Sequence, residues 1–330
     1  MGAVSTSNDP VERLEAALRV GRDAPRKRML IIVNPYATTV SDRLKNLVVY
    51  ALRGSYLVDA IDTEARDHAT ELTREAGREG YDVVVAFGGD GTLNEAANGL
   101  IGSDTPLAFL PGGRTNVYCR MLGVPVDIVD ATEHLLQLAD NWRPRAVDVG
   151  CVNGRGFLFS AGVGLDASVV ERVDAHPRRK ARLGEWYYAV IGVRTFSRHY
   201  LISPPRFEVE VAGRHLIGVT AIVQNSTPYT YFGNRPIYFG EGASLNSGDL
   251  AGIVLRRASP VDIPTIIWRA VSKRARFTRH RQVDGFTGVD GLTFRSLDER
   301  PLPLQVDGDY IGEASEADFS ILPHGLKVLA

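Results

Sequence analysis

The sequence contains few of the residues that mark disulfide-stabilised, membrane-spanning or strongly charged proteins. Its 330 residues include only two cysteines, Cys119 and Cys151, which cannot build a disulfide framework and favour a reducing compartment. No apolar run reaches the roughly 18 residues that a membrane-spanning helix needs, and the first residues contain no apolar signal core. The net charge of −1 creates no field that would attract nucleic acid. These absences predict a cytoplasmic, globular protein that does not bind nucleic acid.

The first half of the chain has the pattern of an α/β domain. Between residues 28 and 145, short runs rich in Val, Ile and Leu, such as Met29–Val33 and Tyr56–Asp62, alternate with amphipathic stretches. This alternation predicts a parallel sheet with helices on both faces. Residues 1–27 are polar around one short amphipathic stretch, and we interpret them as an N-terminal appendage.

The second half, residues 146–311, has the pattern of an antiparallel β-sandwich. Asn153-Gly154 lies between two apolar runs, which is a strong signal for a tight hairpin. Further strands are expected at Phe207–Val211, Val219–Gln224 and Leu250–Leu255, with one helix at Gly184–Phe196. The last twenty residues are expected to add a closing element to one of the two domains.

The most informative stretch is a short apolar strand that ends in glycines. Val83–Phe87 is followed by Gly-Gly-Asp-Gly-Thr, and Thr92 with Glu95 matches the capping box that opens a helix. A strand, a glycine turn and a helix N-terminus together form an anion site that suits phosphate. Asp90 would repel phosphate unless a divalent cation lay between them, and Mg²⁺ binds in this way. The stretch therefore predicts chemistry on a magnesium nucleotide.

Four polar residues follow the expected strands of the first domain: Asn34, Thr63, Asp90 and Asn116. Ligands of parallel α/β sheets bind beyond the carboxyl ends of the strands. We therefore expect these side chains to converge on one crevice. The chain contains no Gly-x-x-x-x-Gly-Lys-Ser/Thr motif, which argues against an ordinary P-loop kinase.

These motifs resemble those of the diacylglycerol kinase catalytic domain family. Gly88–Glu95 resembles the family signature, and Ile31–Pro35 resembles its first nucleotide-binding strand. Leu110–Arg120 is similar to the family's Pro-x-Gly-Thr-x-Asn-Asp-x-x-Arg, and Gln305–Asp309 is similar to its Asp-Gly-Glu. The resemblance covers about residues 28–325. It implies an α/β nucleotide-binding domain, a β-sandwich domain for a lipid substrate, and a chain end, about residues 312–330, that returns to the first domain.

The resemblance implies an ATP- and Mg²⁺-dependent lipid kinase that phosphorylates the hydroxyl of diacylglycerol or a related lipid. It implies Asp90, Asp307 and Asp309 as catalytic carboxylates, with Asp90 and Asp309 also binding the metal. Asp166, in a Gly-x-Gly-x-Asp-Ala stretch, is the expected ligand of the lipid head. The implied nucleotide-binding residues are Asn34, Pro35, Thr38, Thr63, Gly88, Gly89, Asp90, Gly91, Thr92, Asn94, Glu95, Gly113, Arg114, Thr115 and Asn116.

Asp307 is the candidate for the general base that accepts the proton of the lipid hydroxyl. It follows the apolar run Leu304–Val306 and begins an Asp-Gly turn. We expect this turn to project the carboxylate from a strand end into the interdomain cleft. The alternative is a plain Asp-Gly hairpin, which is common.

The chain departs from the family pattern at three places. Arg114 stands where Thr is usual, Val117 stands where a second Asp is usual, and Tyr36–Thr39 replaces a Ser-Gly pair. The Val removes one negative charge near the expected metal, while Arg114 adds a cation suited to phosphate. Two alternatives therefore stay open: a soluble kinase resembling NAD kinase, and a nucleotide- or lipid-binding module without turnover.

Two basic segments contain interfacial aromatic residues. Arg178–Lys180 precedes Trp186, and a second group of arginines and lysines between Arg269 and Arg281 surrounds Trp268. This composition suits peripheral binding to an anionic membrane surface, although solvated protein faces are an equal alternative. The sequence leaves the lipid and the oligomeric state open, including a homodimer.

Overall fold

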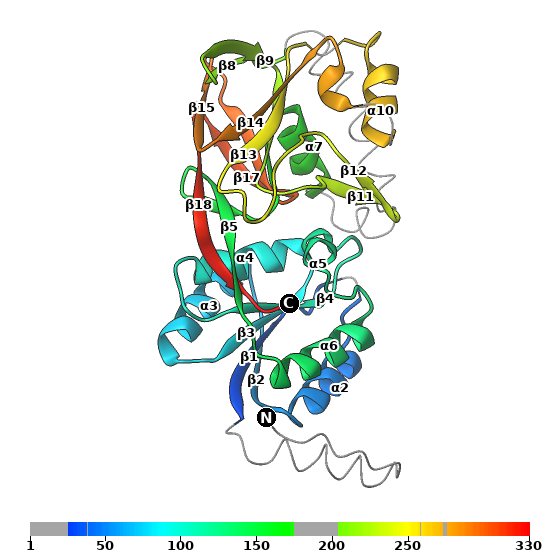
Figure 1. Ribbon diagram of the computed structural model, residues 1–330, viewed down its shortest axis with the longest axis vertical. Coiled ribbons are helices and arrows are strands. Elements are labelled where there is room, and N and C mark those ends of the chain that lie inside the picture. Colours follow the sequence, from blue (N-terminus) through cyan, green and yellow to red (C-terminus); the bar gives the residue numbers. More distant parts are fainter. Residues whose placement is uncertain (1–25, 38, 175–203, 258, 273–275) are drawn as a thin grey trace, which may run out of the picture.

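The structure is a computed structural model that describes residues 26–37, 39–174, 204–257, 259–272 and 276–330. These residues form two lobes, one above the other in Figure 1. The expected helix at 184–196 and nearly all of the expected appendage lie outside the described residues. Within the described ranges, every helix is too short or too polar to span a bilayer.

The first lobe is built on four parallel strands: β1 (Lys27–Val33), β2 (Tyr56–Asp62), β3 (Val83–Gly88) and β4 (Leu107–Pro111). They pair in the order β2-β1-β3-β4. Every residue of β3 and β4 is buried, as expected for strands covered on both faces. The chain order reverses between β1 and β3, so the ligand crevice of this sheet is expected beyond the carboxyl ends of those two strands.

Five helices accompany this sheet: α2 (Asp42–Leu52), α3 (His68–Glu79), α4 (Asp90–Leu100), α5 (Val117–Leu122) and α6 (Ile128–Asp140). The pair α3 and α4 and the pair α2 and α6 each pack together, and the two pairs lie on opposite sides of the sheet (Figure 1). Ser41 caps α2 by accepting a hydrogen bond from the Leu44 N–H at 3.3 Å. Gly80, with φ of +73°, ends α3.

The second lobe is a β-sandwich of two sheets. Its strands are β5 (Arg145–Val152), β6 (Arg155–Phe157), β7 (Ser160–Gly164), β8 (Phe207–Val211), β9 (Arg214–Gly218), β10 (Thr220–Gln224), β13 (Leu250–Leu255), β14 (Val283–Val289), β15 (Gly291–Ser296), β16 (Leu302–Val306), β17 (Asp309–Ala314) and β18 (Glu316–Val328). One sheet has the order β14-β13-β10-β7-β16-β17, and the other contains β5, β6, β8, β9, β15 and β18. The core between them includes edge-to-face contacts of the rings of Phe157, Phe207, Phe294 and Phe319.

The long strand β18 joins the two lobes. It pairs with β15 and β5 in the second lobe, and its residue Val328 pairs in parallel with Leu107 of β4. The parallel sheet of the first lobe and one sheet of the sandwich are therefore a single ten-stranded sheet. Figure 1 shows β18 and β5 running side by side between the lobes. The lobes are thus connected by backbone hydrogen bonds as well as by side chains.

Smaller elements cover the sandwich next to the interlobe cleft. The hairpin of β11 (Thr230–Phe232) and β12 (Arg235–Ile237) forms a sheet of its own. Helix α7 (Leu165–Asp174) lies against β7, β16 and β17, and helix α10 (Ile263–Val271) lies against β12 and the 3₁₀ turn η2 (Phe277–Arg279).

The expected fold class is confirmed, but several details differ. The hairpin at Asn153-Gly154 is present, with φ of +47° and +81° at these two residues. The expected capping box is wrong, because α4 begins at Asp90, and Gly89, its N-cap residue, forms no side-chain cap. Strands β9 and β14 were missed because they contain Arg, His, Asp and Gly, which have low β-propensity. The domain limits near residues 28, 145 and 312 stay predictions.

We expect Phe319→Ala to destabilise the protein by about 3–5 kcal/mol, because the side chain is 1% exposed and packs on Phe157 and Phe294. The measurement is denaturant unfolding. Leu322→Ala, on the same strand but at a residue that is 37% exposed, is the control and should change stability much less. Equal losses for the two variants would contradict the assignment of Phe319 to the core.

Candidate functional site

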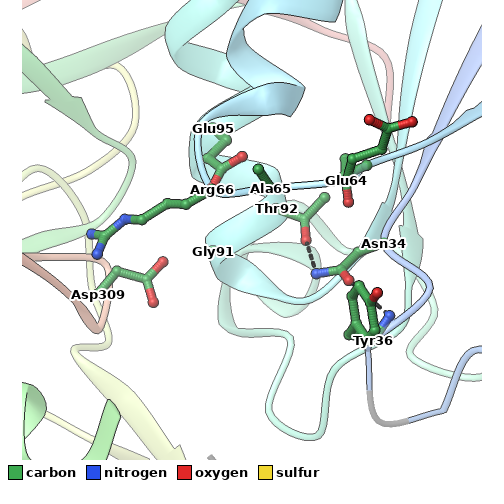
Figure 2. A pocket seen from close by; sticks show the side chains of 10 residues that line it. Asn34, Tyr36, Glu64, Ala65, Arg66, Gly91, Thr92, Glu95 and Asp309 are labelled. Atoms are coloured by element: carbon green, nitrogen blue, oxygen red, sulfur yellow. Dashed lines mark hydrogen bonds between the residues drawn. The ribbon is translucent and has the colours of Figure 1, made fainter. Parts of the chain in front are cut away.

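A pocket of about 450 Å³ lies at the carboxyl end of the parallel sheet and faces the second lobe. It is next to β1 and β3, where the strand order reverses, as expected for an α/β sheet. Figure 2 shows the side chains that point into it. The lining residues are Asn34, Tyr36, Thr63, Glu64, Ala65, Arg66, Gly91, Thr92, Glu95 and Asp309.

The sheet side of the pocket carries polar groups held by local hydrogen bonds. The Asn34 side-chain amide donates to Thr92 Oγ1 at 3.0 Å, and the Asn34 side-chain carbonyl accepts from the Tyr36 N–H at 2.9 Å (Figure 2). Thr63 extends the same wall, since its backbone N–H bonds to the Val33 carbonyl at 2.8 Å. Of the four residues expected to converge on one crevice, Asn34 and Thr63 line the pocket together with Thr92, whereas Asp90 and Asn116 do not.

The glycines of the signature provide space for the protein's own atoms. A Cβ on Gly88 would lie 2.6 Å from Thr92 Oγ1, and a Cβ on Gly91 would lie 2.3 Å from Asp309 Oδ2. A Cβ on Gly113 would lie 2.9 Å from Gly89 Cα. None of these glycines has a positive φ, so close packing explains them better than backbone conformation does. The Gly91 contact brings a carboxylate of the second lobe against the first turn of α4, where the helix dipole stabilises negative charge.

Charged side chains from both lobes meet in the pocket. Glu64, Glu95 and Asp309 supply three carboxylates, and Arg66 supplies a guanidinium. Arg66 Nη2 donates to the carbonyl oxygen of Tyr310, the residue after Asp309 on β17. The cleft is therefore crossed by a direct contact between the loop before α3 and the second lobe.

Asp307 does not line the pocket, so the expectation that its carboxylate projects into the cleft is wrong. The side chain is 5% exposed and accepts hydrogen bonds from the backbone N–H groups of Leu158, Phe159 and Ser160 at 2.7–3.1 Å. It also accepts from the Asn94 amide at 2.8 Å. Burial raises the pKa of Asp307 to about 6, and these donors lower it. Asp307 and Gly308 have φ of +49° and +86°, which fits a type I′ hairpin turn.

Asn94 links the two lobes and does not face the pocket. Its amide N–H groups reach Gly156 O at 2.9 Å as well as Asp307. Its side-chain oxygen accepts from Arg155 Nη2 at 3.1 Å, and Arg155 also pairs with Asp67 at 2.7 Å. The amide N–H groups and the amide oxygen of the buried Asn94 side chain all form hydrogen bonds within the protein. No donor or acceptor of this side chain is therefore left for the predicted contact with the nucleotide in this structure.

Asp90 is half-buried and does not line the pocket. Its two carboxylate oxygens accept from the backbone N–H groups of Val117 and Tyr118 at 3.1 and 3.2 Å. Burial raises the pKa of Asp90, and these two N–H groups lower it. Asp90 therefore supports the first turn of α5, at the position where the family pattern has Asp and this chain has Val117. Its predicted role as a metal ligand is untested.

The loop before α5 is closed on itself. The Asn116 side chain accepts from the Gly113 N–H at 3.0 Å and donates to the Gly113 carbonyl at 2.8 Å. The Thr115 carbonyl oxygen accepts a hydrogen bond from Arg120 Nε. Arg114 is exposed. None of these four predicted nucleotide contacts, nor Pro35, lines the pocket. Thr38 lies outside the described residues.

Asp166 forms a separate polar site in the second lobe, near the turn that carries Asp309. Its oxygens accept from the Tyr229 hydroxyl and from Gln305 Nε2, both at 2.7 Å. Gln305 in turn accepts from the Gly308 N–H at 2.9 Å. A Cβ on Gly162 would lie 2.1 Å from Asp166 Oδ2, which explains the first glycine of the motif. Burial raises the pKa of Asp166. Its role toward substrate stays a prediction.

Sequence reasoning missed Tyr36, Glu64, Ala65 and Arg66 as pocket residues. Glu64, Ala65 and Arg66 could have been found from their position directly after Thr63, at the end of an expected strand. No group of three or more His, Cys, Asp or Glu in the described ranges is arranged to bind a metal alone. The carboxylates of Glu95 and Asp309 nevertheless fit Mg²⁺ held jointly with phosphates, which needs only one or two protein carboxylates.

Comparisons with known proteins agree with this geometry. Residues 28–152 match the model of the diacylglycerol kinase catalytic domain. A diacylglycerol kinase of Bacillus subtilis is 29% identical over 240 residues, which cover 71% of this chain and 75% of that protein. A diacylglycerol kinase of Staphylococcus aureus is 27% identical over 313 residues, which cover 92% and 93%.

A crystal structure of a diacylglycerol kinase from Bacillus anthracis has the same fold. Its TM-score is 0.66 at 19% identity, over 93% of this chain and 97% of that one. The names of these relatives support a kinase. Residues 28–152 belong to the diacylglycerol kinase catalytic domain family, as the sequence motifs indicated.

We expect Asp90→Ala to lower stability by about 2 kcal/mol, because it leaves two buried N–H groups at α5 without an acceptor. The measurement is the denaturant midpoint. Asp42→Ala is the matched control, since Asp42 is an exposed acid in the first turn of α2, and it should change stability by less than about 0.5 kcal/mol. Wild-type stability for Asp90→Ala would show that this cap contributes nothing.

Asp307 should make stability depend on pH. Its pKa of about 6 in the folded protein lies above the ordinary Asp value of 3.8, so the unfolded chain loses this proton first as pH rises. The free energy of unfolding, relative to Asp307→Asn, should therefore fall by about 2 kcal/mol from pH 4 to 6. Urea unfolding of both proteins across this range measures the difference. A difference that grows with pH would mean that the four donors outweigh burial.

Proposed function

We propose that this protein is an ATP- and Mg²⁺-dependent lipid kinase that phosphorylates a hydroxyl of diacylglycerol or a related lipid. The observation that carries the proposal is the carboxylate of Asp309, which the second lobe places against the first turn of α4 in the pocket. The names of relatives that match more than nine-tenths of the chain support the lipid as the acceptor.

In this proposal, Glu95 and Asp309 hold Mg²⁺ with the nucleotide, and the first turn of α4 faces the phosphates. When bound, ATP would supply the phosphoryl group, and Mg²⁺ would offset the negative charge of its phosphates. The residues of the chain position the nucleotide, exclude water from the cleft and accept the proton of the lipid hydroxyl. Arg66 adds a positive charge to a pocket that also contains three carboxylates. This charge stabilises phosphate anions during phosphoryl transfer.

Asp309 is a better proton acceptor than Asp307, the first candidate from the sequence. Asp309 lines the pocket, and Asp307 does not. Protonating Asp307 would weaken the hydrogen bonds that its carboxylate accepts from three backbone N–H groups. We assign Asp307 a positioning role: it fixes the turn that precedes Asp309.

The expected result for Asp309→Asn is a loss of about 10²- to 10⁴-fold in kcat. Single-turnover phosphorylation with labelled ATP, Mg²⁺ and a panel of lipids in detergent micelles measures it, with nucleotide binding measured in parallel. Asp318→Asn is the control, because Asp318 is an exposed acid on β18. Normal turnover by Asp309→Asn alongside an inactive Asp307→Asn would reverse the assignment of the base.

The same lipid panel tests the alternatives. Phosphate transfer to NAD but to no lipid would favour the soluble kinase, and nucleotide binding without transfer to any acceptor would favour the binding module. The names of the relatives favour the lipid kinase over both. A homodimer stays a prediction.

A further inference from the structure

Exposed aromatic side chains gather on the hairpin β11–β12 and the neighbouring helix α10. Phe232, Tyr238 and Trp268 are 43%, 50% and 57% exposed. The two elements are in contact, and we call them, together with η2, the lip. Large aromatic residues that also carry a polar group, such as Tyr and Trp, are typical of surfaces that sit at a membrane–water boundary.

The lip is a rigid platform, because its inner side is packed. The ring of Phe239 lies 4.8 Å from Tyr229 and 4.8 Å from Phe277 in edge-to-face contacts, and Ile266 of α10 packs in the same cluster. Phe277 of η2 is 6% exposed and belongs to this core. The exposed aromatics therefore project from a buried base and are not loose side chains.

Positive charge surrounds these aromatics. Arg235, Arg276 and Arg279 are exposed on the same elements. Arg276 lies 3.6 Å from Glu241, and Arg281 is neutralised by Asp262 at 2.7 Å. The remaining arginines leave the lip positive overall. Of the other basic residues that the sequence had assigned to a membrane surface, Arg178–Lys180, Lys273 and Arg274 lie outside the described residues.

Hydrogen bonds connect the lip to the candidate site. On its inner side, the Tyr229 hydroxyl donates to Asp166, and Asp166 is linked through Gln305 to the turn before Asp309. At its tip, Asn234 accepts from Arg120 Nη1 of the first lobe at 3.3 Å, and the Arg120 guanidinium lies 4.8 Å from the Tyr231 ring. In this chain of hydrogen bonds, Asp166 therefore lies between the lip and the turn that carries Asp309.

We propose that the lip docks the protein on an anionic bilayer and delivers the lipid toward Asp166. The mixed aromatic and basic surface fits a membrane rather than a protein partner, because it combines interfacial aromatics with arginines that attract anionic headgroups. The inference rests on the proposed function, since it concerns where the lipid acceptor enters.

The test is sedimentation of the full chain with vesicles of phosphatidylcholine, with and without phosphatidylglycerol, in the absence of ATP. Trp268→Ser and Phe232→Ser should each weaken binding to the anionic vesicles by about tenfold. Arg276→Glu and Arg279→Glu should each weaken it by about fivefold or more, and high salt should reduce wild-type binding. All variants are first checked for wild-type thermal unfolding.

Leu47→Ser and Tyr50→Ser are the matched controls, because these side chains are 58% and 80% exposed on α2 of the first lobe. They should bind vesicles as the wild type does. Wild-type binding by the lip variants, equal losses in the controls, or equal binding to neutral vesicles would each overturn the proposal. If the lip binds vesicles as expected but no lipid is phosphorylated, the proposed function fails and the membrane surface stands. If micellar lipid is phosphorylated while the lip variants bind vesicles as the wild type does, the proposed function stands and the membrane-docking role of the lip fails.

Discussion

The Asp307 carboxylate lies between the lobes and accepts hydrogen bonds from three backbone N–H groups before and in β7 and from Asn94 of α4. A buried carboxylate without such donors would be costly, so these segments must stay together for the charge to be tolerated. Two residues further on, Asp309 is brought against α4 by the same turn. The polar cleft therefore depends on the N–H groups that bond to Asp307, although the Asp307 carboxylate itself does not line the cleft.

The sequence was sufficient where a local pattern has one structural solution. Valine-rich runs that end in glycine or asparagine specify buried parallel strands, and the strand switch then determines where polar residues converge. Asn153-Gly154 and Asp307-Gly308 both adopt the positive φ values that a tight hairpin needs. The fold class, the pocket and the pocket positions of Asn34, Thr63, Thr92 and Asp309 could be predicted for these reasons.

The sequence was insufficient where a polar residue must choose between a ligand and the backbone. Asp90, Asn94 and Asn116 lie in motifs that suggest nucleotide contacts, yet their side chains bond to α5, to Asp307 and to Gly113. A pattern gives the position of a side chain along the chain but not which N–H group lies nearest in three dimensions. Arg66 shows the converse, since no motif marked it and its place in the pocket comes from the meeting of two lobes.

The shared strand β18 has a consequence for synthesis on the ribosome. Leu107 of β4 pairs with Val328, so this edge of the first sheet keeps unpaired backbone groups until β18 emerges. Domains usually fold in order from the N-terminus, but here the β4 edge of the first lobe stays open until a strand about 200 residues later in the chain has been made. An open strand edge is a template for aggregation, and chaperones that shield nascent chains should therefore matter more for this protein than for one with two independent domains.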